Sequence, residues 1–221
     1  MKYPKTLFFF LVIFLYTVDV SATTVIAGKT FQDTDFADVL TSSSGVFHTT
    51  VGGAAQPVAT FEQVEAAVTG GNINTFAYTF TPDSYLQVGF TDNAIVNGSG
   101  NDIVIFELGH PDAFTISLAL NGVEKNYSPV RTGYYTPVGG FSINVALVNL
   151  DDFGLAAGAM LSNMVVGLNP LYHGNICQTT PSIAVIAGLN NAAPVPEPAT
   201  MALLGSGLIG LAAARKRKAQ A

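Results

Sequence analysis

Four segments of this chain alternate large apolar side chains with small or polar ones at every second position. They are residues 75–80, 85–90, 114–121 and 141–147. Successive side chains of a β-strand point to opposite faces, so this period places one set on a core face and the other toward solvent. The pattern therefore restricts the chain to a mainly β fold with antiparallel sheets.

Turn signals separate these segments: Thr81-Pro82-Asp83, Asn97-Gly98, Asn121-Gly122 and Gly139-Gly140. Several short strands joined by such turns predict an antiparallel β-sandwich, with a jelly roll as one of its forms.

Helical signals are short. Residues 61–68 are expected to form two turns, with Phe61, Val64 and Val68 on one side, and residues 36–40 to form one turn.

Residues 1–22 have the composition of a secretory signal peptide. Lys2 and Lys5 supply a positive start, residues 7–18 are apolar, and Val20-Ser21-Ala22 is a small-residue cleavage site. The alternative is a signal anchor that stays in the membrane, and Asp19 argues against it. We therefore expect residues 23–193 to form one secreted domain.

The C-terminal residues 194–221 have three parts in a fixed order. Pro194-Val195-Pro196-Glu197-Pro198 is rigid, residues 199–214 are apolar and uncharged, and Arg215, Lys216, Arg217 and Lys218 are basic. An apolar helix followed by cations stops in a bilayer with its charges on the cytoplasmic side. Sixteen residues fall short of the roughly 20 that span comfortably, and snorkelling cations can supply the difference. We therefore predict a transmembrane helix over residues 199–214.

This tail resembles a PEP-CTERM sorting signal, and the resemblance covers only about the last 25 residues. It implies export from a Gram-negative bacterium through the general secretion machinery and an intermediate held in the inner membrane. It also implies processing near Pro196-Glu197-Pro198 by a membrane-embedded exosortase, then delivery to the cell surface or an extracellular polysaccharide matrix. The alternative is a simple tail anchor that is never cut.

The expected domain is acidic. Residues 23–193 carry only three basic residues against thirteen acidic ones, a net charge near −10. Phosphate binding needs clustered cations, so nucleic acid is excluded as a partner. The single cysteine, Cys177, cannot form an intramolecular disulfide and is expected to be buried, the alternative being an intermolecular pair.

Residues 91–102 are the densest polar segment of the chain. Oxygen-bearing side chains of this kind suit Ca²⁺, and a second loop could complete its shell. The candidate ligands are Asp92, Asn97, Asn101 and Asp102, with Asp151 and Asp152 from the second loop. Asp and Asn also form turns without any ligand, so calcium binding and ordinary turn chemistry both stay open.

The same two segments resemble parts of exported bacterial β-sandwich domains. Residues 98–107 match a Gly-x-Gly-x-Asp stretch followed by an apolar strand ending in Phe-Glu. Residues 149–155 match an Asp-Leu-x-x-Phe-Gly segment, with Asn149 in place of the first Asp. This resemblance covers residues 86–168 and implies a β-sandwich on the cell surface without known catalysis.

Catalytic motifs are absent from the sequence. His48, His110 and His173 sit in unrelated contexts, no Gly-x-Ser-x-Gly or phosphate-loop pattern occurs, and nothing pairs the glutamates as a glycosidase requires. Tyr134 and Tyr135 could stack on sugar rings, or one of them could belong to the core.

We therefore expect a non-catalytic surface or matrix protein associated with exopolysaccharide or biofilm. The alternatives are a carbohydrate-binding module with a definite glycan ligand and, less favoured, a secreted hydrolase.

Overall fold

The structure is a computed structural model that describes residues 22–51, 54–118, 122–169, 171–173 and 177–192. The expected signal peptide and the sorting signal with its transmembrane helix lie outside these residues. Within the described part of the chain, no helix is long and apolar enough to cross a membrane.

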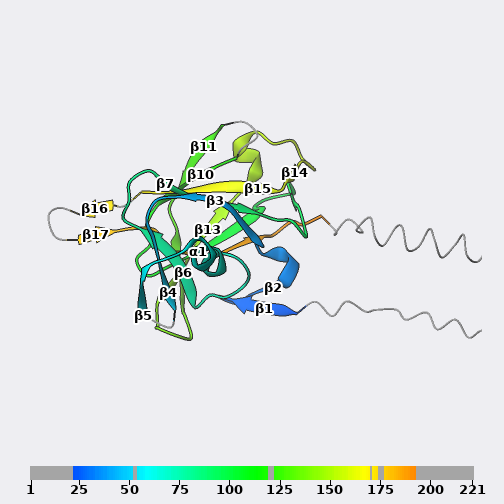
Figure 1. Cartoon of the computed structure of the whole chain (residues 1–221). Helices are drawn as coiled ribbons and strands as arrows, with labels where there is room; N and C mark the ends of the chain where they lie inside the picture. The colour runs from blue at the N-terminus through cyan, green and yellow to red at the C-terminus, as the bar shows by residue number, and fades with distance from the viewer. Residues whose placement is uncertain (1–21, 52–53, 119–121, 170, 174–176, 193–221) are drawn as a thin grey trace, which may run out of the picture.

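The described chain is mainly β, and its two large sheets are antiparallel throughout, as the alternation predicts (Figure 1). In spatial order, the five-stranded sheet is β11 (Glu124–Tyr127), β10 (Phe114–Ser117), β15 (Asn163–Leu168), β7 (Ser84–Gly89) and β3 (Val39–Ser44). The seven-stranded sheet is β12 (Val130–Tyr135), β13 (Ser142–Val148), β9 (Ile103–Leu108), β18 (Ile183–Gly188), β6 (Thr75–Thr79), β4 (Phe47–Val51) and β5 (Ala54–Val58).

The main core lies between these two sheets. Leu86 and Ile116 of the five-stranded sheet share one buried cluster with Ile103, Ile105 and other residues of the seven-stranded sheet. Burying such side chains stabilises the fold by about 1.5–3 kcal/mol each. The predicted sandwich therefore has the expected apolar interior.

A second apolar cluster covers the outer face of the seven-stranded sheet. The hairpin of β1 (Thr23–Ile26) and β2 (Lys29–Gln32) places Ile26 and Phe31 over Val104 and Phe106. The rings of Phe31 and Phe106 meet edge to face, with centroids 5.9 Å apart. Strand β9 is consequently buried on both faces, which explains why five of its six residues are apolar.

This outer cluster changes which side of two strands faces the main core. In β7 and β10 the large residues point between the sheets, as expected. In β6 and β13 the small residues Ala77 and Ala146 point inward, whereas Phe76 and Ile143 join the outer cluster. The alternation correctly predicts strands, but β6 and β13 place their large side chains on the outer face of the seven-stranded sheet.

The predicted helix at residues 61–68 is confirmed as α1 (Phe61–Val68). Thr60 caps it: its hydroxyl accepts from the Gln63 amide, and the Gln63 side chain accepts from the Thr60 amide. Val64 and Val68 are buried, whereas Phe61 is exposed.

The helical turn predicted for residues 36–40 is wrong. The turn lies earlier, in η1 (Asp33–Asp35), where the Asp35 carboxylate accepts the Gln32 amide at 2.7 Å. Phe36 instead forms a β-bridge with Ala187, and β3 begins at Val39. A capping carboxylate therefore decides where the turn begins.

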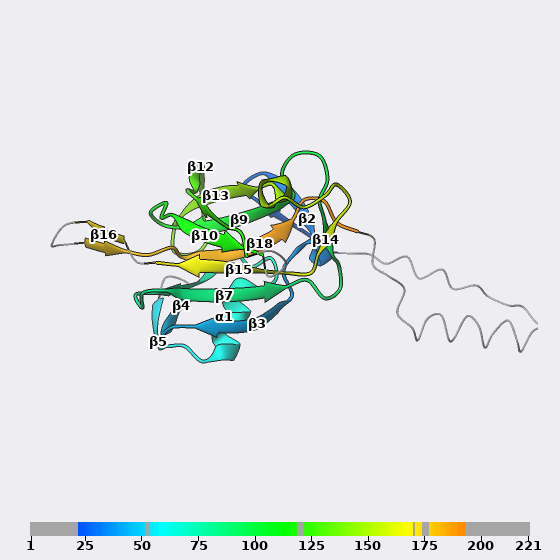
Figure 2. The ribbon, with the colours of Figure 1, turned by 90° about the horizontal axis from the view of Figure 1, so that it is seen from above.

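Smaller elements join the two sheets at their ends. They are β8 (Ile95–Val96) paired with β14 (Met160–Leu161), η2 (Leu150–Phe153), and the hairpin of β16 (Leu171–His173) and β17 (Cys177–Thr179). Cys177 opens β17, but its side chain is outside the described set, so its predicted burial stays a prediction. The β16–β17 hairpin projects from one end of the sandwich, and residues 22 and 192 lie at the opposite end (Figures 1 and 2).

Candidate functional site

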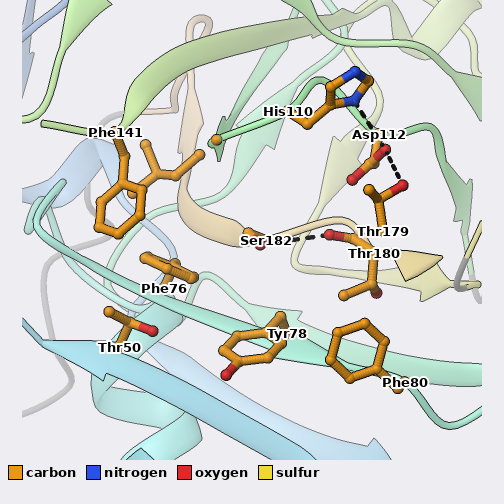
Figure 3. Close-up of a pocket in the computed structure, with 12 residues that line it drawn as sticks. Thr50, Phe76, Tyr78, Phe80, His110, Asp112, Phe141, Thr179, Thr180 and Ser182 are labelled. Carbon is orange, nitrogen blue, oxygen red and sulfur yellow. Dashed lines mark hydrogen bonds and ion pairs between the residues drawn. The ribbon is translucent and has the colours of Figure 1, made fainter. Parts of the chain in front are cut away.

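A pocket of about 360 Å³ lies on the outer face of the seven-stranded sheet, beside the outer cluster (Figure 3). Most of its lining comes from three segments: residues 76–80 of β6 and its end, residues 108–112 at and after the end of β9, and residues 179–182 before β18. Thr50 of β4 and Phe141 complete the lining. Its size falls within the usual range for small-molecule sites. It is therefore a candidate for a binding site.

One wall of the pocket is aromatic. Phe76, Tyr78 and Phe80 occupy alternate positions, so they point to the same side of the sheet. Ring centroids of Phe76 and Tyr78 are 5.9 Å apart, and those of Tyr78 and Phe80 are 5.8 Å apart. Phe141 packs edge-on against Phe76 at 5.2 Å and closes one end. The rings form a row along the strand.

The opposite wall is polar. Asp112 is almost fully buried, and its Oδ1 accepts the Thr179 hydroxyl at 2.9 Å and lies 3.3 Å from Nδ1 of His110. Figure 3 shows the other carboxylate oxygen of Asp112 directed away from these two groups. Thr180 and Ser182 also line the pocket, and their hydroxyls donate to the backbone carbonyls of Thr79 and Thr180, respectively. The pocket thus has an apolar side and a hydrogen-bonding side.

Glu107 lies near this pocket but points into the sandwich. Asn144 donates to its Oε2 at 2.6 Å, and the Ser182 amide donates to its Oε1 at 3.4 Å. Burial raises the pKa of Glu107 to about 9, although the hydrogen bond from Asn144 acts in the opposite direction. Glu107 is therefore a neutral acid at physiological pH.

The two polar loops identified in the sequence do meet in the structure. Asp102 is fully buried; its Oδ1 accepts from the Gly98 amide at 2.7 Å and the Asn190 side chain at 2.8 Å. Its Oδ2 accepts from the Leu150 amide at 2.8 Å. Asp102 therefore ties together residues 98, 150 and 190 with one carboxylate.

Asn97 makes a second connection between these loops. Its side-chain nitrogen donates to Asp151 Oδ1 and to the Leu155 carbonyl, each at 2.8 Å. Its buried Oδ1 has no hydrogen-bond partner among the described residues. Asn97 and Asp102 therefore join this loop to residues 149–155, which is the proximity that a shared calcium shell would need.

The other calcium candidates are placed differently. Asp92 lies against Asp38, whose Oδ2 accepts the Asp92 amide at 3.0 Å, while Asn101 and Asp152 are exposed. Partial burial and the charge of Asp38 raise the pKa of Asp92 to about 6. Among the described residues, no group of three or more His, Cys, Asp or Glu side chains is placed to hold a metal ion. Calcium binding stays a prediction.

Tyr134 and Tyr135 lie on the edge strand β12, outside the pocket. They are 53% and 65% exposed, respectively. The Tyr134 hydroxyl lies over Gly28 in the β1–β2 turn. Their stacking on sugars also stays a prediction.

The comparisons with known proteins concern the tail. The family model of the PEP-CTERM protein-sorting motif matches residues 194–218. The chain carries a PEP-CTERM sorting motif. The motif indicates an exported protein that an exosortase processes at the membrane. Neither the curated proteins nor the solved structures gave a match to the chain.

The matched stretch confirms the resemblance noted in the sequence. It contains all eight residues expected to act in sorting: Val195, Pro196, Glu197, Pro198, Arg215, Lys216, Arg217 and Lys218. These residues lie outside the part of the chain that the structure describes, so their individual roles stay predictions.

Sequence reasoning missed the pocket. Only its aromatic wall left a signal, the alternation of Phe76, Tyr78 and Phe80, which was assigned to strand packing. The polar wall depends on Asp112 and Thr179, which are far apart in the chain and meet only through the fold.

Proposed function

We propose that this protein is a non-catalytic component of the cell surface or extracellular matrix of a Gram-negative bacterium, associated with exopolysaccharide. The PEP-CTERM motif at residues 194–218 is the observation that carries the proposal, because it directs an exported domain to membrane processing. The general secretion machinery would move the chain out, and an inner-membrane intermediate would precede cleavage.

The arrangement of acids supports a binding role rather than hydrolysis. A glycosidase needs two carboxyl groups facing one bond. Among the described lining residues of the pocket, Asp112 is the one carboxylate. Glu107 points instead into the sandwich, where Asn144 and the Ser182 amide occupy its oxygens. The secreted-hydrolase alternative therefore has less support.

The carbohydrate-binding alternative has one specific observation in its favour, the aromatic and polar pocket. Aromatic side chains carry apolar faces, and Tyr adds a polar edge. A surface protein that holds one defined saccharide would combine both leading functions: location in the matrix and recognition of its polymer.

Fractionation of cells tests the proposed function. We expect the wild-type protein to appear in the extracellular matrix fraction and to shift to the soluble medium in a strain that cannot make exopolysaccharide. A matched chain with Glu197→Ala should stay with the inner membrane, because the presumed recognition residue is missing. An unchanged distribution of the wild type without exopolysaccharide would contradict association with the polymer.

A further inference from the structure

We propose that the pocket between β6 and residues 108–112 binds a short stretch of neutral polysaccharide. A sugar ring would lie on the exposed ring of Phe80, with its hydroxyls toward Asp112 and His110. The inference rests on the proposed function, because it names the class of ligand through which the exported domain would bind its matrix. It differs from the sequence-based expectation, which placed glycan stacking at Tyr134 and Tyr135.

The aromatic wall has the form of a strip. Phe76, Tyr78 and Phe80 follow one another along a strand, and adjacent rings contact each other at about 6 Å between centroids. Phe80 remains 42% exposed, so the strip is open at the end beyond β6. Phe76 is buried at the other end of the strip, so Phe80 is the ring that a ligand unit with a C–H face could stack on, with Tyr78 at its edge.

The polar wall is held in place before any ligand arrives. Thr179 donates to Asp112, and His110 contacts the same oxygen. Fixing a buried carboxylate in advance lowers the ordering cost of binding, and a carboxylate is a strong acceptor for hydroxyl groups. Saccharide hydroxyls can donate to this carboxylate, and the C–H face of the same sugar ring can pack on the aromatic wall. The two walls therefore match the two kinds of surface that a sugar presents.

Charge decides between saccharide classes. Asp112 lies in the pocket wall, and residues 23–193 carry a net charge near −10. An acidic polysaccharide would meet repulsion from both. The three basic residues of this region, Lys29, Lys125 and Arg131, are not among the residues that line the pocket. The site therefore favours a neutral polymer.

The position of the pocket suits a tethered or matrix-bound protein. Ile103 and Leu108 are the two ends of β9, about 17 Å apart at the usual strand rise. Ile103 pairs with Gly188, near the point where the described chain ends at residue 192, whereas the pocket lies beyond Leu108. The pocket thus opens at the end of the sandwich away from the sorting segment.

An organic cation is the competing ligand, because aromatic faces and a carboxylate also attract positive charge. A cation cage surrounds one point with several ring faces. Here Phe76 and Phe141 meet edge to face at 78°, and Tyr78 and Phe80 meet at 79°, so the rings pack against one another. These contacts leave the exposed Phe80 ring available for stacking, and one open ring face suits the C–H face of a sugar better than a cation that several ring faces must surround.

The test is calorimetric titration of the processed protein recovered from the producing cells. The probes are oligosaccharides released from the matrix, separated into neutral and acidic fractions, and choline as an organic cation. We expect binding of the neutral fraction. Phe80→Ala should weaken that binding about three- to tenfold, and Asp112→Asn about tenfold, through lost stacking and a weakened charge-assisted acceptor.

Phe61→Ala is the matched control, since Phe61 is also 42% exposed but lies on α1, outside the pocket. Equal weakening by Phe61→Ala and Phe80→Ala would overturn the proposal, as would no binding, binding of the acidic fraction alone, or binding of choline alone. If Tyr134→Ala abolished saccharide binding and Phe80→Ala did not, the site would lie on β12 and the proposal would be overturned.

Correct sorting without saccharide binding would contradict this inference alone, whereas saccharide binding by a protein that never reaches the matrix would contradict the proposed function alone.

Discussion

Glu107 is a buried acid whose charge the fold suppresses. It has no exposed surface, and burial raises its pKa to about 9 from an ordinary value of 4.5. The folded state therefore keeps a proton that the unfolded chain releases above about pH 4.5. Because the unfolded state binds fewer protons in this window, the free energy of unfolding falls as pH rises toward 9.

Replacing Glu107 by glutamine should remove this pH dependence. The amide keeps an oxygen for Asn144 but has no proton to lose. We expect the wild type to lose stability relative to Glu107→Gln between pH 5 and 8, by at most about 1.4 kcal/mol per pH unit. Urea denaturation at several pH values measures it, and parallel profiles for the two proteins would contradict the assignment of a neutral Glu107.

Asp102 stabilises three chain segments through hydrogen bonds. Asp102→Ala would leave the partly buried amide of Gly98 and the buried amide of Leu150 without their acceptor. We expect a loss of about 3 kcal/mol or more in chelator, because each unsatisfied buried donor costs about 1–3 kcal/mol. Asp152→Ala, at an exposed position in the second loop, is the control and should change little.

Melting in millimolar Ca²⁺ separates the calcium hypothesis from this hydrogen-bond account. Ca²⁺ bound only to the folded state would add about 2.7 kcal/mol at a hundredfold excess over Kd. If calcium binds at these loops, Tm rises in the wild type and the rise is lost in Asp102→Asn. A wild-type Tm that does not change on addition of Ca²⁺ would rule out the calcium hypothesis, and these residues would then act only as turn formers.

At the scale of elements, the sequence identifies strands more reliably than it identifies the inner face. Alternation marks β6 and β13 as strands, but both of their faces are covered. Ala77 and Ala146 fit between the sheets, and Phe76 and Ile143 pack under the β1–β2 layer. A period of two cannot distinguish a covered outer face from the main core, because both are apolar.

The β1–β2 layer should therefore contribute strongly to stability. Phe31 packs against Phe36, with centroids 5.6 Å apart, and against Phe106. We expect Phe31→Ala to cost about 3–5 kcal/mol. Val25→Ala, on the exposed side of the same hairpin, should stay within about 0.5 kcal/mol. Similar losses in both variants, measured by urea denaturation, would show that the hairpin is not a core layer.

The candidate site was only partly predictable for a related reason. Asp and Asn mark residues 97–102 and 149–155 as turns, because these side chains bond to nearby backbone groups. The sequence suggests only that the two loops could share a calcium shell, whereas their contact through Asp102 and the Leu150 amide joins residues 48 positions apart and depends on the fold. The pocket joins segments up to about a hundred residues apart, such as Phe80 and Thr179, and nothing local in the sequence specifies that contact. Long-range strand pairing supplies it.

At the scale of the whole molecule, the pocket and the two ends of the described chain lie at opposite ends of the sandwich. The described chain begins at residue 22 and ends at residue 192 on one side of the sandwich (Figure 2). The PEP-CTERM motif follows at residues 194–218. A protein processed at the membrane through this tail would present the far end of the sandwich, with its pocket, away from the point of processing.

The most direct test of the account is the intact mass of the protein from cells with and without their exosortase. In the presence of the enzyme, the exported form should lack residues 1–22 and 199–221, with cleavage near Pro196-Glu197-Pro198. Without the enzyme, or with Glu197→Ala, the mass should include residues 199–221 and the protein should stay in the membrane. A surface form that retains residues 199–221 in wild-type cells, with a mass unchanged by loss of the enzyme, would contradict the account.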